Sequence, residues 1–181
     1  MNLWPPSPPR GKATMVLCPL MLVLMYGAAA ASPPRLLVLD IELSGDLGGA
    51  NLITEHQARL QRESNLLRET LAGTNRYRIL DDSDVRPLVT QLKSQHMYLH
   101  DCNGCDLQIG QALDADQVLA PWVYRVSALI LTLTYELHDA RTGQILARES
   151  YDFRGDNDAA WTHAIRFMAR HMQDQSPVRT P

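Results

Sequence analysis

Two histidines and two cysteines fall within ten residues of the chain, in a segment without helix or strand periodicity. They are His96, His100, Cys102 and Cys105. In an oxidising compartment, two cysteines this close normally form a disulfide, and Gly104 between them gives the backbone the freedom to close so small a ring. The first interpretation is structural: a Cys102–Cys105 disulfide fixes the entry to a short helix and stabilises the fold by about 2 kcal/mol at best.

The same residues allow two chemical alternatives. A cysteine at a helix N-terminus has a lowered pKa, which favours thiol–disulfide exchange, although thioredoxin-type sites place the motif directly after a buried strand and here a loop precedes it. Histidine nitrogen and cysteine sulfur are also the ligands that zinc prefers. His96, His100, Cys102 and Cys105 are therefore a candidate metal set, although zinc fingers separate their ligand pairs by a longer segment. If neither alternative holds, both histidines are expected to be solvent-exposed.

A second candidate site lies at the end of the first apolar strand. Asp40 and Glu42 alternate with Leu39 and Ile41, so a period of two places both carboxylates on one face. Paired carboxylates can perform acid–base chemistry, and ligands commonly bind at the carboxyl ends of strands in α/β sheets. Asp40 and Glu42 are therefore the expected ligand site if the chain binds a small molecule; otherwise such acids cap loops or contact water.

Motifs of common enzyme classes are missing from the sequence. It contains no Ser-His-Asp set, no His-Glu-x-x-His motif and no glycine-rich phosphate loop of the required spacing. We therefore expect no catalytic residue, no cofactor and no enzymatic activity. The net charge of −3 and the lack of a basic patch also argue against nucleic acid as a partner.

A β-hairpin over residues 129–153 is the clearest of the elements that position these residues. Leu131, Leu133 and Tyr135 alternate with polar residues, which is typical of a strand with one buried face. The segment from Asp139 to Gly143 suits a turn, and the alternation then resumes. Such a hairpin is marginal alone, so helices must cover its apolar face.

The remaining periodicities predict three further strands and four helices. The strands are centred on residues 36–43, 77–80 and 118–126, and the helices on residues 54–73, 83–95, 107–113 and 156–172. The order β-α-β-α-α-β-β-β-α implies parallel pairing early in the chain and an antiparallel meander later. The expected fold class is α/β (α+β), with a mixed sheet of about five strands and helices packed on the sheet.

The N-terminal segment carries an export signal. Arg10 and Lys12 precede an apolar run of about a dozen residues, which is too short to span a bilayer, and small residues follow it. Residues 1–31 are therefore predicted to be a signal peptide, and residues 173–181 a disordered tail. Cys18 lies inside the apolar run, without the small preceding residue of a lipobox, so the mature protein is expected to be soluble, periplasmic or secreted, and without a membrane span.

The layout resembles the amino-terminal domain of TolB, the CsgG-type curli secretion protein and the lipoprotein activators of penicillin-binding proteins. The shared segments are a Tyr-Arg-Ile-Leu-Asp strand at residues 77–81, Leu-Asp-Ala-Asp-Gln-Val-Leu at residues 113–119, and the Asp139–Gly143 turn. The chain more closely resembles a bacterial family of uncharacterised secreted proteins or lipoproteins, a domain of unknown function. Its marks are Cys-Asn-Gly-Cys at residues 102–105, Trp122 in its strand, and Arg154-Gly155 followed by Asp-Asn-Asp. This resemblance implies a single TolB-like domain over residues 32–172 and gives almost no indication of an activity.

Together these observations favour a non-catalytic, exported accessory module that binds another envelope protein through a sheet edge or helix face. A thiol-redox or metal-binding protein that uses Cys102 and Cys105 is the first alternative. A small-ligand-binding periplasmic domain is the second.

Overall fold

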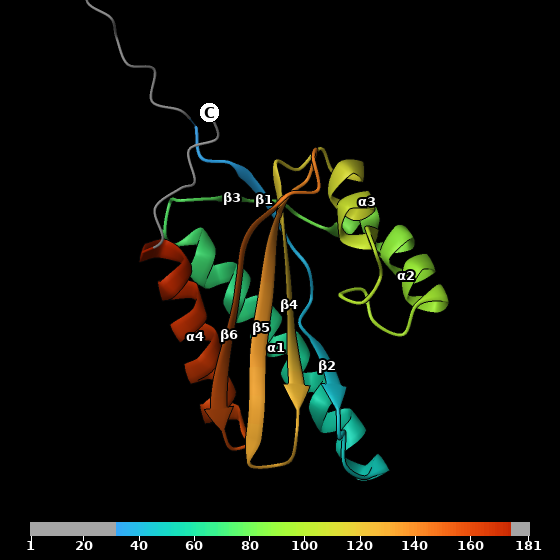
Figure 1. Cartoon of the computed structure of the whole chain (residues 1–181), viewed down its shortest axis with the longest axis vertical. Helices are drawn as coiled ribbons and strands as arrows, with labels where there is room; N and C mark the ends of the chain where they lie inside the picture. The colour runs from blue at the N-terminus through green and yellow to red at the C-terminus, as the bar shows by residue number, and fades with distance from the viewer. Residues whose placement is uncertain (1–31, 175–181) are drawn as a thin grey trace, which may run out of the picture. The chain divides into compact units, whose positions relative to one another are not determined.

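The computed structural model describes residues 32–174, which form a mixed α/β fold with four α-helices and one six-stranded sheet (Figure 1). The strands are β1 (Arg35–Val38), β2 (Glu42–Gly45), β3 (Arg78–Ile79), β4 (Gln117–Arg125), β5 (Ile130–Asp139) and β6 (Ile145–Arg154). The helices are α1 (Ile53–Ala72), α2 (Arg86–Gln95), α3 (Cys105–Ala112) and α4 (Asp158–Asp174), with 3₁₀ turns at Ala50–Leu52 and Ser83–Val85. The predicted fold class is confirmed.

The sheet has the order β3-β1-β4-β5-β6, and β2 also pairs with β4. β1 is parallel to β3 and to β4, whereas β4, β5 and β6 are antiparallel neighbours. The hairpin alternation is confirmed, because Leu131, Leu133 and Tyr135 are fully buried. The turn is closed by the Gly143 N–H, which donates to the Asp139 carbonyl oxygen at 2.9 Å, and Gly143 has the positive φ that this turn requires.

The first apolar run forms two strands instead of one, which accounts for the sixth strand. Val38 pairs with Leu119 and Glu42 with Trp122, so this segment has one more residue than β4 between the two pairs, as in a β-bulge. The interruption lies opposite Pro121 of β4, which has no N–H to donate to a ladder. Pro121 thus lies at the irregularity, where a residue without an N–H is tolerated in a sheet.

The extra residue reverses the alternation of faces along this segment. Leu37 and Leu39 pack on one side of the sheet, whereas Ile41 and Leu43 pack on the other side. The expectation that Asp40 and Glu42 share a face is therefore wrong, because strict period two does not hold across a bulge.

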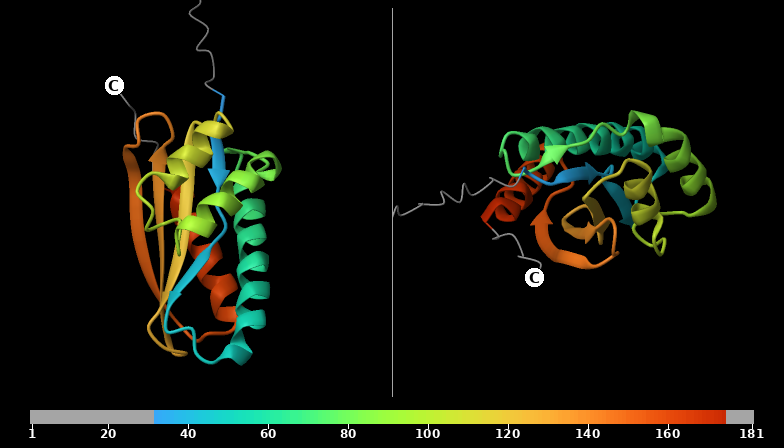
Figure 2. Two further views of the ribbon diagram at one scale, coloured as in Figure 1. Left: turned by 90° about the vertical axis from the view of Figure 1, so that its right-hand side faces the viewer. Right: turned by 90° about the horizontal axis from the view of Figure 1, so that it is seen from above.

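Helices cover the sheet from both sides (Figure 2). α1 and α4 bury the larger core, in which Leu67, Trp161 and Met168 pack against β5. α2 and α3 bury a smaller core around Ile109 and Val118. The strands β4–β6 extend beyond α3, so none of the described helices lies in front of part of their second face (Figure 1).

The predicted signal peptide and most of the predicted tail lie outside the described residues. Gln173 and Asp174, which belong to the predicted tail, form the last turn of α4. Among residues 32–174, no helix combines the length and the apolar character needed to cross a membrane.

Candidate functional site

The predicted cysteines lie in the loop between α2 and α3, residues 96–104, and at the start of α3. Cys102 and Cys105 are joined by a disulfide, with a Cα–Cα separation of 5.5 Å. Cys105 is the first residue of α3 and is buried in the smaller core, whereas Cys102 is half-buried. Gly104 between them has a φ of 91°, which a non-glycine residue rarely adopts. The disulfide connects the loop to the helix, as the structural interpretation requires.

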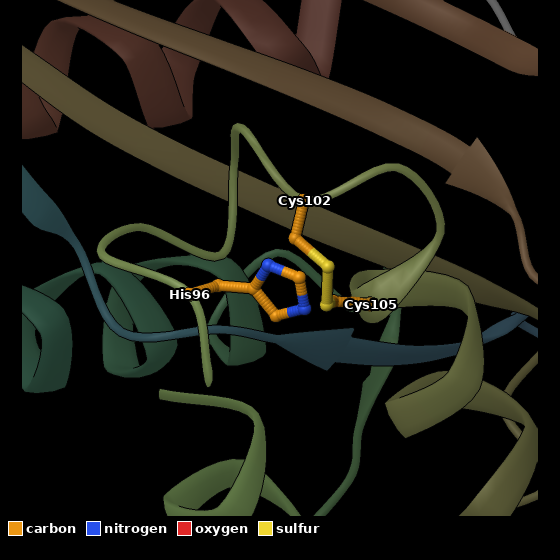
Figure 3. Close-up of side chains that lie close together, drawn as sticks. All are labelled: His96, Cys102 and Cys105. Carbon is orange, nitrogen blue, oxygen red and sulfur yellow. A yellow bond between two sulfur atoms is a disulfide. The ribbon is translucent and has the colours of Figure 1, made fainter. Parts of the chain in front are cut away.

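The structure brings three of the four candidate metal ligands together. Ligand atoms of His96, Cys102 and Cys105 lie within 4.8 Å of one another (Figure 3). His100 is not part of this group, because its Nδ1 atom lies 2.6 Å from a carboxylate oxygen of Glu42. The four-residue set predicted from the sequence is therefore not assembled around the sulfur atoms.

Glu42 binds the loop to the sheet through three contacts. Its carboxylate accepts hydrogen bonds from the backbone N–H groups of Leu99 at 2.9 Å and His100 at 3.1 Å, in addition to its contact with the His100 ring. Burial raises the pKa of Glu42, but the hydrogen bonds from the His100 ring and from both backbone groups outweigh it, so its pKa lies below its ordinary value. The charged carboxylate is thus the form that holds the loop.

The ring of His100 also stacks on Trp122 of β4. The two ring centroids are 4.8 Å apart with an interplanar angle of 6°. The guanidinium carbon of Arg148 on β6 lies 6.0 Å from the centre of the same indole. Trp122 is half-buried, in contrast to Tyr135 and Trp161, which are buried in the core.

A second histidine lies next to this loop and contacts two carboxylates. His138 Nδ1 contacts a carboxylate oxygen of Asp106, and its Nε2 lies 3.1 Å from Glu136. Glu136 in turn forms an ion pair with Arg148 at 2.9 Å. A crevice of about 260 Å³ lies between the disulfide loop and the hairpin, and it is lined in part by His100, Asp106, Glu136 and His138.

No sequence motif marks the group formed by His138, Glu136 and Asp106, but the spacing of two of these residues indicates part of it. Glu136 and His138 are two residues apart and therefore share the polar face of their strand. Asp106, however, lies in the first turn of α3, 32 positions from His138, and only the tertiary fold brings them together.

Asp40 lies in a different place from Glu42. Its carboxylate is 2.7 Å from Nη2 of Arg68 on α1, and it lines a groove of about 640 Å³ between α1 and α2. The lining includes Asp40 after β1 and residues 80–82 after β3, so the groove is at the carboxyl ends of two parallel strands. Glu42 does not line it. The predicted two-residue ligand site is therefore divided, and only Asp40 lies at a groove.

The uncovered part of the sheet exposes large apolar side chains. Tyr124 is 51% exposed, Val126 52% and Ile130 45%. Tyr124 pairs with Thr132, and the Val126 N–H donates to the Ile130 carbonyl oxygen, so these side chains project from one face of the hairpin. We call this surface the open face; its other members are Thr132, Ser150 and Asp152.

The fold and these sites belong to a known family. Residues 34–172 match the model of the family DUF3280, described as "Protein of unknown function (DUF2380)", so the chain belongs to this family. This confirms the resemblance to a domain of unknown function. No curated protein matches the chain.

Several solved structures are similar to this chain. The LpoB C-terminal domain from Salmonella enterica is 16% identical and aligns over 69% of this chain and 85% of that chain, with a TM-score of 0.45. The PelC dodecamer from Paraburkholderia phytofirmans is 14% identical, with coverages of 82% and 93% and a TM-score of 0.47. TolB from Acinetobacter baumannii is 14% identical, with coverages of 78% and 27% and a TM-score of 0.44. At these scores the similarities carry no conclusion about what this chain binds.

Proposed function

We propose that this protein is a non-catalytic module of the bacterial envelope that binds another envelope protein through its open face. The observation that carries the proposal is the exposure of Tyr124, Val126 and Ile130 on a part of the sheet that no helix of residues 32–174 covers. Contiguous exposed apolar side chains mark interaction sites on soluble domains. The assignment to the envelope is supported by the signal-peptide pattern of residues 1–31.

The composition of the open face suits a protein partner. Tyrosine is enriched among residues that dominate binding energy, since it offers a rigid apolar ring with a polar end. The polar residues that border the apolar patch already satisfy one another: the Thr132 hydroxyl bonds Asp152 at 2.7 Å, and the Thr134 and Ser150 hydroxyls are 2.9 Å apart. A partner with a complementary apolar patch can therefore bind without breaking these hydrogen bonds.

A pull-down from periplasmic extract tests this function. The tagged protein should recover a defined partner, and the double variant Tyr124→Ser/Ile130→Ser should lose it. Met97→Ser is the matched control, because Met97 is 85% exposed and lies outside the open face. Absence of a partner, or equal recovery by the double variant, would refute the proposal.

The groove beside Asp40 supports a second candidate function, the binding of a small polar molecule. β1 continues through β2 to α1, and β3 is followed by α2; these two helices pack on opposite faces of the sheet, and ligands bind at such points in α/β folds. Arg86 and Lys93 of α2 provide positive charge opposite Asp40 and Asp81. Thermal-shift measurements with zwitterionic amino acids and short peptides should show stabilisation that is lost in Lys93→Ala. No shift with any of these probes would exclude this candidate.

A further inference from the structure

We propose that reduction converts the disulfide loop into a binding site for a zinc-type cation, held by His96, Cys102 and Cys105. The three ligand atoms lie within 4.8 Å of one another while the disulfide is closed, and the His96 ring lies beside the two sulfur atoms (Figure 3). This site is independent of the open face and of the groove beside Asp40, because it shares no residue with either.

The distances require only a small adjustment. Zinc bonds of about 2.3 Å to sulfur and about 2.0–2.1 Å to nitrogen place tetrahedral ligand atoms roughly 3.3–3.8 Å apart. The histidine nitrogen therefore has to approach by about 1.5 Å at most, and the sulfur atoms have to separate after the bond between them is broken. A Cα–Cα separation of 5.5 Å allows both cysteines to reach one ion by rotation of their side chains.

Backbone interactions hold the three residues in place without the disulfide. His96 follows the last residue of α2, and its N–H donates to the Leu92 carbonyl oxygen at 2.9 Å. The Cys102 N–H donates to the Leu99 carbonyl oxygen at 3.1 Å, and Leu99 is itself bound to Glu42. Cys105 begins α3, whose N-terminal end favours a negatively charged sulfur.

A protein with two neighbouring thiols can reduce the Cys102–Cys105 disulfide. The dithiol gives two electrons and two protons to the Cys102–Cys105 bond, which becomes two thiols, and the donor becomes a disulfide. Binding of the cation then releases the two thiol protons to water, as two metal–sulfur bonds and one metal–nitrogen bond form.

Three protein ligands leave the fourth tetrahedral position open to water or to a partner's side chain. His100 is not needed, because it stays bound to Glu42. The cation would then cross-link the loop and α3 in place of the disulfide.

Cobalt binding tests this site. The purified protein is reduced with a phosphine in the absence of oxygen and titrated with Co²⁺, followed by Zn²⁺. We expect one Co²⁺ per chain, a sulfur-to-cobalt charge-transfer band and the visible bands of a tetrahedral ion, all removed by Zn²⁺. His96→Ala should weaken binding by about tenfold or more, whereas His163→Ala, which removes an exposed histidine of α4, should not change it.

Three results would overturn the proposal. They are a disulfide that the phosphine does not reduce in the folded protein, a reduced protein without the charge-transfer band, and equal binding by His96→Ala and the unsubstituted chain. Cys102→Ser/Cys105→Ser should show no charge-transfer band. Because His96 is exposed, His96→Ala is expected to fold, so it tests the site even if Cys102→Ser/Cys105→Ser does not fold.

Discussion

Charged residues cluster on both sides of the sheet, and the two clusters differ in chemistry. On the side of α1 and α4, Asp156 accepts from Arg59 at 2.9 Å, from Arg125 at 2.7 Å and from the Trp161 indole at 3.1 Å. We call this the arginine cluster. The histidine cluster, on the other side, comprises Glu42, His100, Asp106, Glu136 and His138.

The two clusters also differ in their surroundings. The side chains of Arg59, Arg125 and Asp156 are all less than a tenth exposed. The histidine cluster lines a crevice beside the disulfide loop. The arginine cluster thus fixes how α1, β4 and α4 meet, whereas the histidine cluster couples a surface loop to the sheet.

The largest effect is expected from Asp156→Ala. It leaves two buried guanidinium groups without their shared carboxylate, which costs about 3–5 kcal/mol of the free energy of unfolding. Urea denaturation measures this loss. Asp152→Ala is the control, because Asp152 is an exposed carboxylate bonded to Thr132 and its loss should cost less than about 1 kcal/mol. Equal losses of unfolding free energy in Asp156→Ala and Asp152→Ala would contradict the expectation that the buried cluster contributes more than a surface pair.

Glu42→Ala should have the next largest effect, about 1–3 kcal/mol, because two backbone N–H groups and one imidazole lose their acceptor. The lowered pKa of Glu42 fixes the sign of the pH dependence. Its contribution is complete above the ordinary glutamate pKa of about 4.3 and is lost as the pH falls through the lowered value. The difference in the free energy of unfolding between the unsubstituted protein and Glu42→Ala should therefore become smaller at acid pH.

The matched control for this pH series is Asp84→Asn, which changes an exposed carboxylate outside both clusters. If the difference in the free energy of unfolding between Glu42→Ala and the unsubstituted protein stayed constant down to acid pH, this would contradict the assigned role of the charged carboxylate.

Removal of the disulfide should cost less than loss of the arginine cluster. The ring is so short that Cys102→Ser/Cys105→Ser is expected to lower the free energy of unfolding by about 2 kcal/mol or less. Glu42 still holds Leu99 and His100 in this variant, so the loop should keep its place on the sheet. Hydrogen exchange at the Leu99 amide measures this directly, and exchange as fast as in Glu42→Ala would show that the disulfide, not Glu42, holds the loop.

The sequence predicts elements well where a local period decides them. Leu131, Leu133 and Tyr135 share a face because a strand has a period of two, and no distant residue alters this. The break between β1 and β2 depends on residues far along the chain: the Ile41 N–H donates to the Ser64 hydroxyl, and Pro121 lies opposite the break. A local pattern does not contain these partners.

The candidate sites divide in the same way, into contacts that local spacing predicts and contacts that only the tertiary fold creates. The proximity of Cys102 and Cys105 is local and could be predicted from their spacing. Glu42 and His100 are 58 positions apart, and their contact exists only because the bulge turns Glu42 toward the loop. A single inserted residue thus decides which carboxylate reaches the histidine cluster and which lines the groove.

The smallest expected effect tests a carboxylate that belongs to neither cluster. Glu63 of α1 is 3% exposed; one oxygen accepts from the Thr162 hydroxyl at 2.9 Å, and the other has no hydrogen-bond partner among residues 32–174. Burial raises the pKa of Glu63 and outweighs the bond to Thr162. A raised pKa means that stability is greatest when the carboxyl is protonated and falls as the pH rises through that value.

Glu63→Gln should therefore stabilise the protein by a few tenths to about 1 kcal/mol at neutral pH, and this gain should vanish in acid, where the native carboxyl is already neutral. Thermal or urea unfolding at both pH values measures it, with Glu69→Gln on the exposed side of α1 as the control. A loss of stability at neutral pH would show that Glu63 is held as a carboxylate by the charges of Arg62 and Arg166, which lower its pKa. Glu63 would then be a buried charge with partners of its own, because a charge that stabilises a buried position must have a partner there.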